Sequence, residues 1–208
     1  MPELPSLYLI TDRHQVRAER NLLDILAELL DAGVKLVQLR EKDLSSAQLF
    51  PMAQMIRKLT RNYGCQLLIN DRVDIALATD ADGVHLGGHS LPVSCARKLL
   101  GPDKLIGVST HSNAELLKAA NAGADFATFG PVFYTPSKAA FGTPVGLCAL
   151  EQACQMSPIP VYGLGGIKID NAPDICRTGA HGIALISALL TAPSPANSYQ
   201  KLLKSLAS

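Results

Sequence analysis

Short apolar runs alternate with amphipathic segments along the whole chain. The runs are apolar for nearly their full length, which is typical of parallel strands that helices cover. Between them, apolar residues recur three and four positions apart, as in Leu22–Leu30 and Ala47–Leu59, and this period predicts helices. We expect strands at Leu7–Thr11, Val34–Leu39, Gln66–Asn70, Gly83–Leu86, Leu105–Val108, Phe126–Phe129, Pro160–Gly163 and Gly182–Ile186.

The expected strands begin at intervals of roughly 20–30 residues, about the spacing that a βαβ unit requires. Three segments, which begin at Asp31, Asn121 and Arg177, place a glycine where a helix would end in the left-handed conformation and a strand would follow. This alternation predicts an α/β fold in which residues 1–208 form a single (β/α)8 TIM barrel. An open, doubly wound sheet is the alternative.

Composition indicates which kinds of molecule the protein binds. Apolar residues make up 48% of the chain and the formal net charge is +1, so a core is available and no global basic field points to nucleic acid. We see no signal peptide and no apolar run that could span a membrane. The five cysteines form no CxxC pair, which suggests reduced thiols that serve as small core residues. We therefore expect a soluble, cytoplasmic protein with small-molecule partners, no nucleic acid or membrane partner, and an oligomeric state left open.

Glycine and hydroxyl residues follow the last two expected strands. Gly165 and Gly166 stand between a strand and a helix, and Ile186-Ser187 follows the last strand in the same way. Backbone amides at such turns bind phosphate, and the loops after the seventh and eighth strands of a barrel often do so. The glycines could also serve only to let the chain turn.

The second and third expected strands end in charged and amide residues. Alternation puts Gln38, Arg40 and Lys42 on one side of the strand, facing the barrel mouth if the strand continues that far, and this set suits a polyanion. A solvated strand end is the alternative. Asn70 and Asp71 could hold Mg²⁺ together with substrate phosphates, or could cap the next helix.

The fifth and sixth expected strands lead into further polar residues. Ser109 could donate to an oxyanion, whereas His111 could transfer protons or be a surface residue. The connection after Phe129 is the longest in the chain, as expected of a lid or binding loop, with a merely flexible loop as the alternative. It carries hydroxyls and a cation that would bind a phosphate: Thr135, Ser137 and Lys138.

Taken in order, these motifs resemble the thiamine phosphate synthases and their sister branch, the thiazole tautomerases. The resemblance covers nearly the whole chain and rests on Tyr8–Asp12, Gln38–Lys42, Asn70-Asp71, Gly83–Gly87, Gly107–His111, Gly130–Phe133, Thr135–Lys138, Gly165–Ile167 and Ile186-Ser187. It implies transfer of a pyrimidine-methyl group from its diphosphate onto the nitrogen of a thiazole phosphate. Pyrophosphate would leave first, and the thiazole would trap the resulting cation.

The resemblance also implies roles for individual residues. The diphosphate would be bound by Arg40, Lys42, Asn70 and Lys138. Asp71 would hold Mg²⁺, while Gln38 and Ser109 would contact the pyrimidine end or its leaving group. The thiazole phosphate side would be formed by Thr135, Ser137, Gly166, Ile186 and Ser187. The catalytic candidates, which would stabilise the departing diphosphate, are Arg40, Lys42, Ser109 and Lys138.

One departure from the family pattern concerns the metal. The synthases commonly carry a second acidic Mg²⁺ ligand at the position of Ser90. Its loss predicts weaker Mg²⁺ binding and leaves open a metal-independent tautomerase with His111 as acid–base residue. A non-catalytic regulatory barrel that binds thiazole phosphate, or another phosphate-handling barrel enzyme, is a further alternative.

Overall fold

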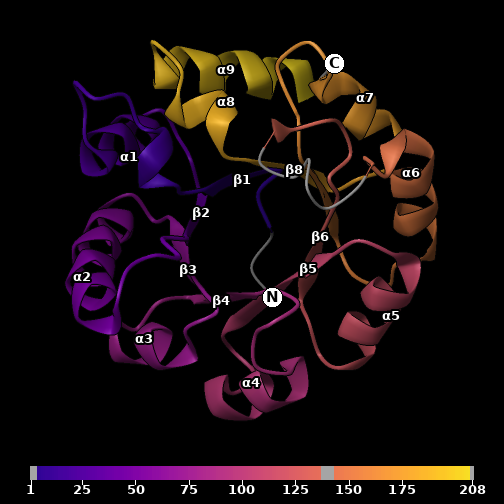
Figure 1. Cartoon of the computed structure of the whole chain (residues 1–208), viewed down its shortest axis with the longest axis horizontal. Coiled ribbons are helices and arrows are strands. Elements are labelled where there is room, and N and C mark those ends of the chain that lie inside the picture. Colours follow the sequence, from indigo (N-terminus) through magenta and orange to yellow (C-terminus); the bar gives the residue numbers. More distant parts are fainter. Residues whose placement is uncertain (1–3, 137–142, 207–208) are drawn as a thin grey trace.

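The apolar runs of the sequence form eight parallel strands that close on one another. The computed structural model describes residues 4–136 and 143–206. Its strands are β1 (Leu7–Ile10), β2 (Leu36–Leu39), β3 (Gln66–Asn70), β4 (Gly83–Leu86), β5 (Leu105–Thr110), β6 (Phe126–Phe129), β7 (Val161–Leu164) and β8 (Gly182–Leu185). Each strand pairs with the next, and β1 pairs with β8 through Leu7 and Ile183, which closes the barrel (Figure 1). The predicted TIM barrel is confirmed, and the open sheet is excluded.

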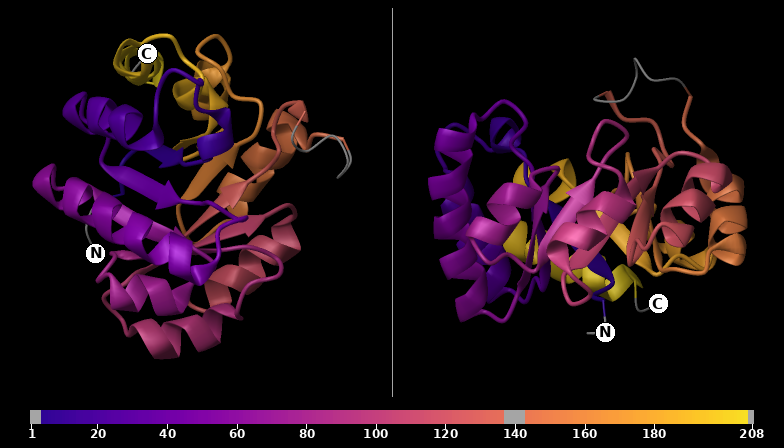
Figure 2. Two further views of the ribbon diagram at one scale, coloured as in Figure 1. Left: turned by 60° about the vertical axis from the view of Figure 1, so that its left-hand side comes forward. Right: turned by 90° about the horizontal axis from the view of Figure 1, so that it is seen from below.

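Helices surround the barrel and bury the outer faces of the strands (Figures 1 and 2). In chain order they are η1 (Arg13–Gln15), α1 (Leu22–Asp31), α2 (Ser46–Asn62), α3 (Val73–Ala78), α4 (Val93–Leu100), α5 (Asn113–Asn121), α6 (Gly146–Met156), α7 (Ala172–Arg177), α8 (Ser187–Leu190) and α9 (Pro195–Leu206). No helix within the described ranges has both the length and the apolar character needed to cross a membrane.

The bounds of β1, β2, β5, β7 and β8 differ from the expected ones by one or two residues, and the two larger differences have local causes. Strand β2 begins at Leu36 rather than Val34, because the Val34 N–H donates to the Leu29 carbonyl at 3.0 Å and so still belongs to the end of α1. Strand β5 continues to Thr110, because Ser109 and Thr110 both pair with β6. Ser109 therefore belongs to a strand that is paired with β6 and not to the loop that follows.

The repeated helix–strand junctions adopt the predicted backbone. Gly33, Gly123 and Gly179 have φ angles of 112°, 96° and 81°, which L side chains rarely adopt. Each glycine ends a helix and redirects the chain toward the next strand, so these segments are structural, as expected.

The barrel interior is filled with side chains and is not a pore. One buried cluster faces inward from the strands: Tyr8, Ile10, Leu36, Leu68, Leu105, Phe126, Tyr162 and Ala184. The Phe126 ring lies with its centroid 5.5 Å from those of Tyr8 and Tyr162, both in edge-on contacts. The Tyr162 hydroxyl donates to the Pro5 carbonyl at 2.5 Å, which ties the interior to the chain segment that precedes β1. In such barrels the chemistry lies at the carboxyl ends of the strands.

The expectation that all cysteines pack in the core is wrong for part of the set. Cys65 is buried, whereas Cys95 and Cys148 are exposed on α4 and α6. All five thiols are free.

Candidate active site

The β2–α2 loop is held by a buried carboxylate. Glu41 accepts hydrogen bonds from the Thr11 hydroxyl at 2.7 Å and from the Arg13 backbone N–H at 3.1 and 3.2 Å. The Arg13 guanidinium adds a bond at 3.1 Å, and the Glu41 side chain is only 1% exposed. The loop after β1 and the loop after β2 are therefore joined at this carboxylate, which we call the Glu41 anchor (Thr11, Arg13 and Glu41).

The anchor places two cations at the barrel mouth. The Arg40 backbone N–H donates to the Thr11 hydroxyl at 2.9 Å, and the next residue in the chain is Glu41 itself. The anchor therefore fixes the Arg40 backbone on both sides. Arg40 is half-buried and Lys42 is exposed. Among the residues that the structure describes, neither side chain takes part in a salt bridge. Both charges are therefore available to an anion.

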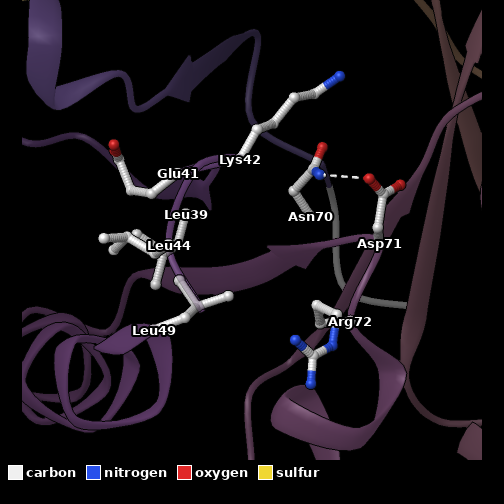
Figure 3. A pocket seen from close by; sticks show the side chains of 8 residues that line it. All are labelled: Leu39, Glu41, Lys42, Leu44, Leu49, Asn70, Asp71 and Arg72. Atoms are coloured by element: carbon white, nitrogen blue, oxygen red, sulfur yellow. Dashed lines mark hydrogen bonds between the residues drawn. The ribbon is translucent and has the colours of Figure 1, made fainter. Parts of the chain in front are cut away.

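A pocket of about 240 Å³ opens between the β2–α2 and β3–α3 loops (Figure 3). It is lined by Leu39, Glu41, Lys42, Leu44, Leu49, Asn70, Asp71 and Arg72. Figure 3 shows the Asn70 and Asp71 side chains facing each other, and the Asn70 amide donates to Asp71 Oδ2 at 2.7 Å. The structure thus brings the predicted Lys42 and the predicted Asn70-Asp71 pair to one cavity.

Asn70 and Asp71 do not serve as helix caps. Helix α3 begins after Arg72, which provides no side-chain capping bond, so the capping interpretation is wrong. Asp71 instead adopts a left-handed backbone with φ of 61°, an uncommon and costly conformation for an aspartate. Its N–H donates to the His85 carbonyl at 2.9 Å, which helps to hold this conformation.

The side chains around Asp71 decide whether Mg²⁺ could bind at this position. Ser90 Oγ hydrogen-bonds Asp71 Oδ1 and accepts the Gly87 N–H at 2.6 Å. No cluster of three or more His, Cys, Asp or Glu side chains able to hold a metal occurs in the described part of the chain. One carboxylate with nearby amide and hydroxyl oxygens still fits Mg²⁺, which often takes one or two carboxylates and lets substrate phosphates supply other ligands. The residues therefore fit a metal site that a phosphorylated substrate completes.

A row of hydrogen-bonded side chains crosses the barrel interior below the mouth. Gln38 Nε2 donates to the Tyr8 hydroxyl at 2.7 Å, and the Tyr8 hydroxyl lies 3.2 Å from His85 Nδ1. His85 Nε2 lies 3.0 Å from Ser109 Oγ. We call these four residues, from β2, β1, β4 and β5, the interior network. Sequence reasoning predicted Gln38 and Ser109 as site residues and missed the two that connect them.

Burial keeps the middle of the interior network neutral. Burial lowers the pKa of His85 to about 3, with Arg40 lowering it further and Asp71 opposing. Burial also raises the pKa of Tyr8 well above its usual value. Two polar atoms in this interior, Gln38 Oε1 and Thr128 Oγ1, are buried without a hydrogen-bond partner among the described residues. Buried polar atoms without partners are uncommon, so each is a candidate contact for a ligand.

His111 occupies the rim rather than the interior. It is exposed, and its Nδ1 hydrogen-bonds the Gly130 carbonyl at the end of β6. Its backbone N–H donates to Glu115 Oε2 at 2.7 Å. Ser112 accepts the Glu115 N–H at 3.3 Å and caps α5, as one interpretation of the sequence held.

The late loops pack tightly around Gly166. Its φ is 65°, and a Cβ at this position would lie 2.5 Å from the Tyr134 carbonyl oxygen, so the loop after β7 rests directly against the loop after β6. Asn171 donates to the Gly166 carbonyl at 3.1 Å and accepts the Lys168 N–H at 2.7 Å, which pins the turn.

The remaining predicted residues lie around the same loops. Ile186 precedes α8 and Ser187 is its first, exposed residue, so both follow β8 as predicted. Thr135 lies in the loop after β6. Ser137 and Lys138 lie outside the described residues.

Known proteins of one family match this chain over nearly its whole length. The sequence model described as "Thiamine monophosphate synthase" matches residues 7–189. The chain is 52% identical to a Geobacter sulfurreducens protein with a provisional thiamine-phosphate synthase name, over 95% of this chain and 92% of that protein. It is 42% identical to the thiamine-phosphate synthase of Roseiflexus sp. (strain RS-1), over 91% and 80% of the two chains. Among solved structures, a thiamine phosphate pyrophosphorylase from Pyrococcus furiosus superimposes with a TM-score of 0.88 at 35% identity, over 97% of this chain and 95% of that one.

Proposed function

This chain belongs to the thiamine monophosphate synthase family, and we propose that it joins hydroxymethylpyrimidine diphosphate to thiazole phosphate. In the proposed reaction the bond between the pyrimidine methylene carbon and the diphosphate oxygen breaks, and its electron pair leaves with pyrophosphate. The thiazole nitrogen lone pair then forms a bond to the methylene carbon of the resulting cation. The products are thiamine phosphate and pyrophosphate, which makes the chain a transferase.

The observation that carries the proposal is the pair of cations left without a salt bridge at the mouth. Arg40 and Lys42 lie in the loop held by the Glu41 anchor, and Lys42 lines the pocket between the loops together with Asn70. Charge fixed in advance stabilises a departing diphosphate without reorganisation during the reaction. We assign these three side chains, together with Lys138 from the family motif, to the diphosphate.

We assign Mg²⁺ to Asp71, with the Asn70 amide and the Ser90 hydroxyl beside it. When bound, Mg²⁺ would offset negative charge on the diphosphate oxygens. Because this site supplies one carboxylate, the substrate's own oxygens are needed to complete it.

We assign the acceptor phosphate to the late loops. The Gly166 turn follows β7, and Ile186 and Ser187 at the start of α8 follow β8. Because β7 and β8 are paired neighbours, the backbone amides of the two loops are suited to binding one phosphate together. Thr135, together with Ser137 from the family motif, would line the thiazole side. Gln38 and Ser109, which lie deeper, would contact the pyrimidine end or its leaving group.

The synthase is favoured over the tautomerase alternative. Relatives that are 42% and 43% identical to this chain carry synthase names. The chain also has Arg40, Lys42 and the Asn70-Asp71 pair, which a tautomerase would not need for binding a diphosphate. We further propose a cytoplasmic location, which the free thiols support, and small phosphorylated molecules as the partners.

The test is a turnover assay with both substrates, run with Mg²⁺ and with EDTA. We expect thiamine phosphate and pyrophosphate in equal amounts with Mg²⁺ and a large loss of rate with EDTA. Lys42→Ala should raise KM for the diphosphate, whereas Lys98→Ala on the outer shell should not. Absence of product with fresh substrates and excess Mg²⁺ would contradict the proposal. Metal-independent isomerisation of the thiazole carboxylate phosphate, lost in His111→Ala, would support the tautomerase instead.

A further inference from the structure

In the interior network, the number of hydrogens on each group decides which partner donates in each hydrogen bond. Gln38 turns its amide nitrogen toward Tyr8 and leaves its carbonyl oxygen buried without a partner among the described residues. The Tyr8 hydroxyl therefore accepts from Gln38, and its own hydrogen must go to another acceptor. The nearby acceptor is His85 Nδ1, at 3.2 Å.

This count fixes the rest of the network. A neutral imidazole carries one hydrogen, and here Nδ1 must be the acceptor, so the hydrogen resides on Nε2. His85 Nε2 then donates to Ser109 Oγ across 3.0 Å. Because Ser109 accepts that bond, its own hydroxyl hydrogen is free to point away from the network. All bonds run in one direction, from Gln38 to Ser109.

We propose that Tyr8 and His85 are positioning residues that set the hydrogen-bonding polarity of Gln38 and Ser109, the two residues assigned above to the pyrimidine substrate. They hold Gln38 so that it presents an acceptor, and they hold Ser109 so that it presents a donor. Neither residue needs to touch the substrate to do so. This inference rests on the proposed function, since it assigns the two ends of the network to the two ends of one substrate.

The polarity matches the substrate's chemistry. The acceptor at Gln38 suits the ring amino group of the aminopyrimidine, whose N–H bonds strengthen as positive charge develops on the ring. The donor at Ser109 suits an anionic oxygen of the departing diphosphate. With the opposite polarity, Gln38 would present N–H to an amino group, and Ser109 would present a lone pair to an anion.

The test compares two interior tyrosines that differ in their hydroxyl partner. Tyr8→Phe removes the hydroxyl from the network, whereas Tyr162→Phe removes one that bonds the Pro5 carbonyl instead. Both rings are buried and both contact Phe126 edge-on, so the two variants make a matched pair. Three competitive inhibitors serve as probes: the aminopyrimidine monophosphate, its analogue with hydrogen in place of the amino group, and inorganic pyrophosphate.

We expect the wild type and Tyr162→Phe to prefer the amino compound over the analogue by about tenfold or more, the worth of one well-placed bond. In Tyr8→Phe the preference should fall to about twofold because Gln38 can then rotate, and pyrophosphate should inhibit less well because no hydroxyl then keeps the His85 hydrogen on Nε2. His85→Met, which breaks both links, should lose the amino preference and also weaken pyrophosphate binding.

An unchanged amino preference in Tyr8→Phe, or an equal loss in Tyr162→Phe, would overturn the positioning proposal. If Tyr8→Phe does not fold, His85→Met carries the same comparison. These outcomes are distinct from failure of the proposed function, in which the wild type itself would form no thiamine phosphate.

Discussion

The Glu41 anchor makes a prediction about both stability and substrate binding. Glu41→Gln keeps the shape of the side chain but replaces one carboxylate oxygen with an NH₂ group. Oε1 accepts from Thr11, so the amide nitrogen would face the Arg13 N–H groups, and donor would meet donor. The two Arg13 bonds to Oε2 would be lost, whereas the Thr11 bond to Oε1 and the fold of the barrel would remain.

The magnitude follows from the partners lost. A hydrogen bond to a charged group is worth about 1.5–3 kcal/mol, and breaking a fully buried ion pair costs about 3–5 kcal/mol. The Arg13 side chain is 27% exposed and can turn to water, so the lower end applies. We expect the free energy of unfolding to fall by about 2 kcal/mol, which lowers Tm by about 4–8 °C in a chain of this size.

The assay is urea unfolding at pH 7, together with KM for the diphosphate substrate. Asp43→Asn is the matched control, because Asp43 also pairs with Arg13 but at an exposed site, where ion pairs contribute little. We expect Glu41→Gln to raise KM about tenfold, since Arg40 and Lys42 lose their fixed placement, and Asp43→Asn to change little. The reasoning is refuted if the two variants behave alike, or if Glu41→Gln loses stability while KM stays at the wild-type value.

Three further predictions concern the metal, the late loops and pH. Ser90→Asp should add a second carboxylate beside Asp71 and lower the Mg²⁺ concentration for half-maximal rate, measured by Mg²⁺ titration; an unchanged midpoint would mean that another group already fills this role. Gly166→Ala should destabilise the protein by more than about 1 kcal/mol and weaken thiazole phosphate binding, whereas Gly64→Ala, also left-handed at φ 57° but with open space around it, should leave that binding intact. Because the pKa of His85 is lowered by burial to about 3, the unfolded chain binds a proton that the folded chain does not between about pH 6.5 and 3. Stability should therefore fall by up to about 1.4 kcal/mol per pH unit below pH 6.5, and urea unfolding of His85→Asn should show a shallower decline.

The sequence predicted the barrel and the carboxyl-end position of several candidate residues. Alternation along β2 was enough to put Gln38 on the inward side, where it bonds Tyr8, since side chains alternate across any strand. The role of Glu41, which follows this strand, could not be predicted, because its partners come from the loop after β1 and only the fold brings that loop near.

The interior network was hidden from the sequence for a related reason. Tyr8 and His85 stand in short apolar strands and fit there as core residues. Which inward side chains meet depends on the register between strands, such as His85 opposite Gly107 in β5, and register is not written in either strand alone. A glycine at that position leaves room for the imidazole, since a Cβ on Gly107 would lie 2.7 Å from His85 Nδ1.

Closure of the sheet through β1 and β8 has a consequence for self-association. In the part of the chain that the structure describes, every strand has a neighbour on both sides, so no row of unpaired backbone groups is offered to another molecule. Growth by strand addition, the usual route from open sheets to ordered aggregates, therefore has no starting point in the native barrel. Any assembly of folded copies has to form through the helical shell or the loops, whose side chains can change without disturbing the strands that hold the site.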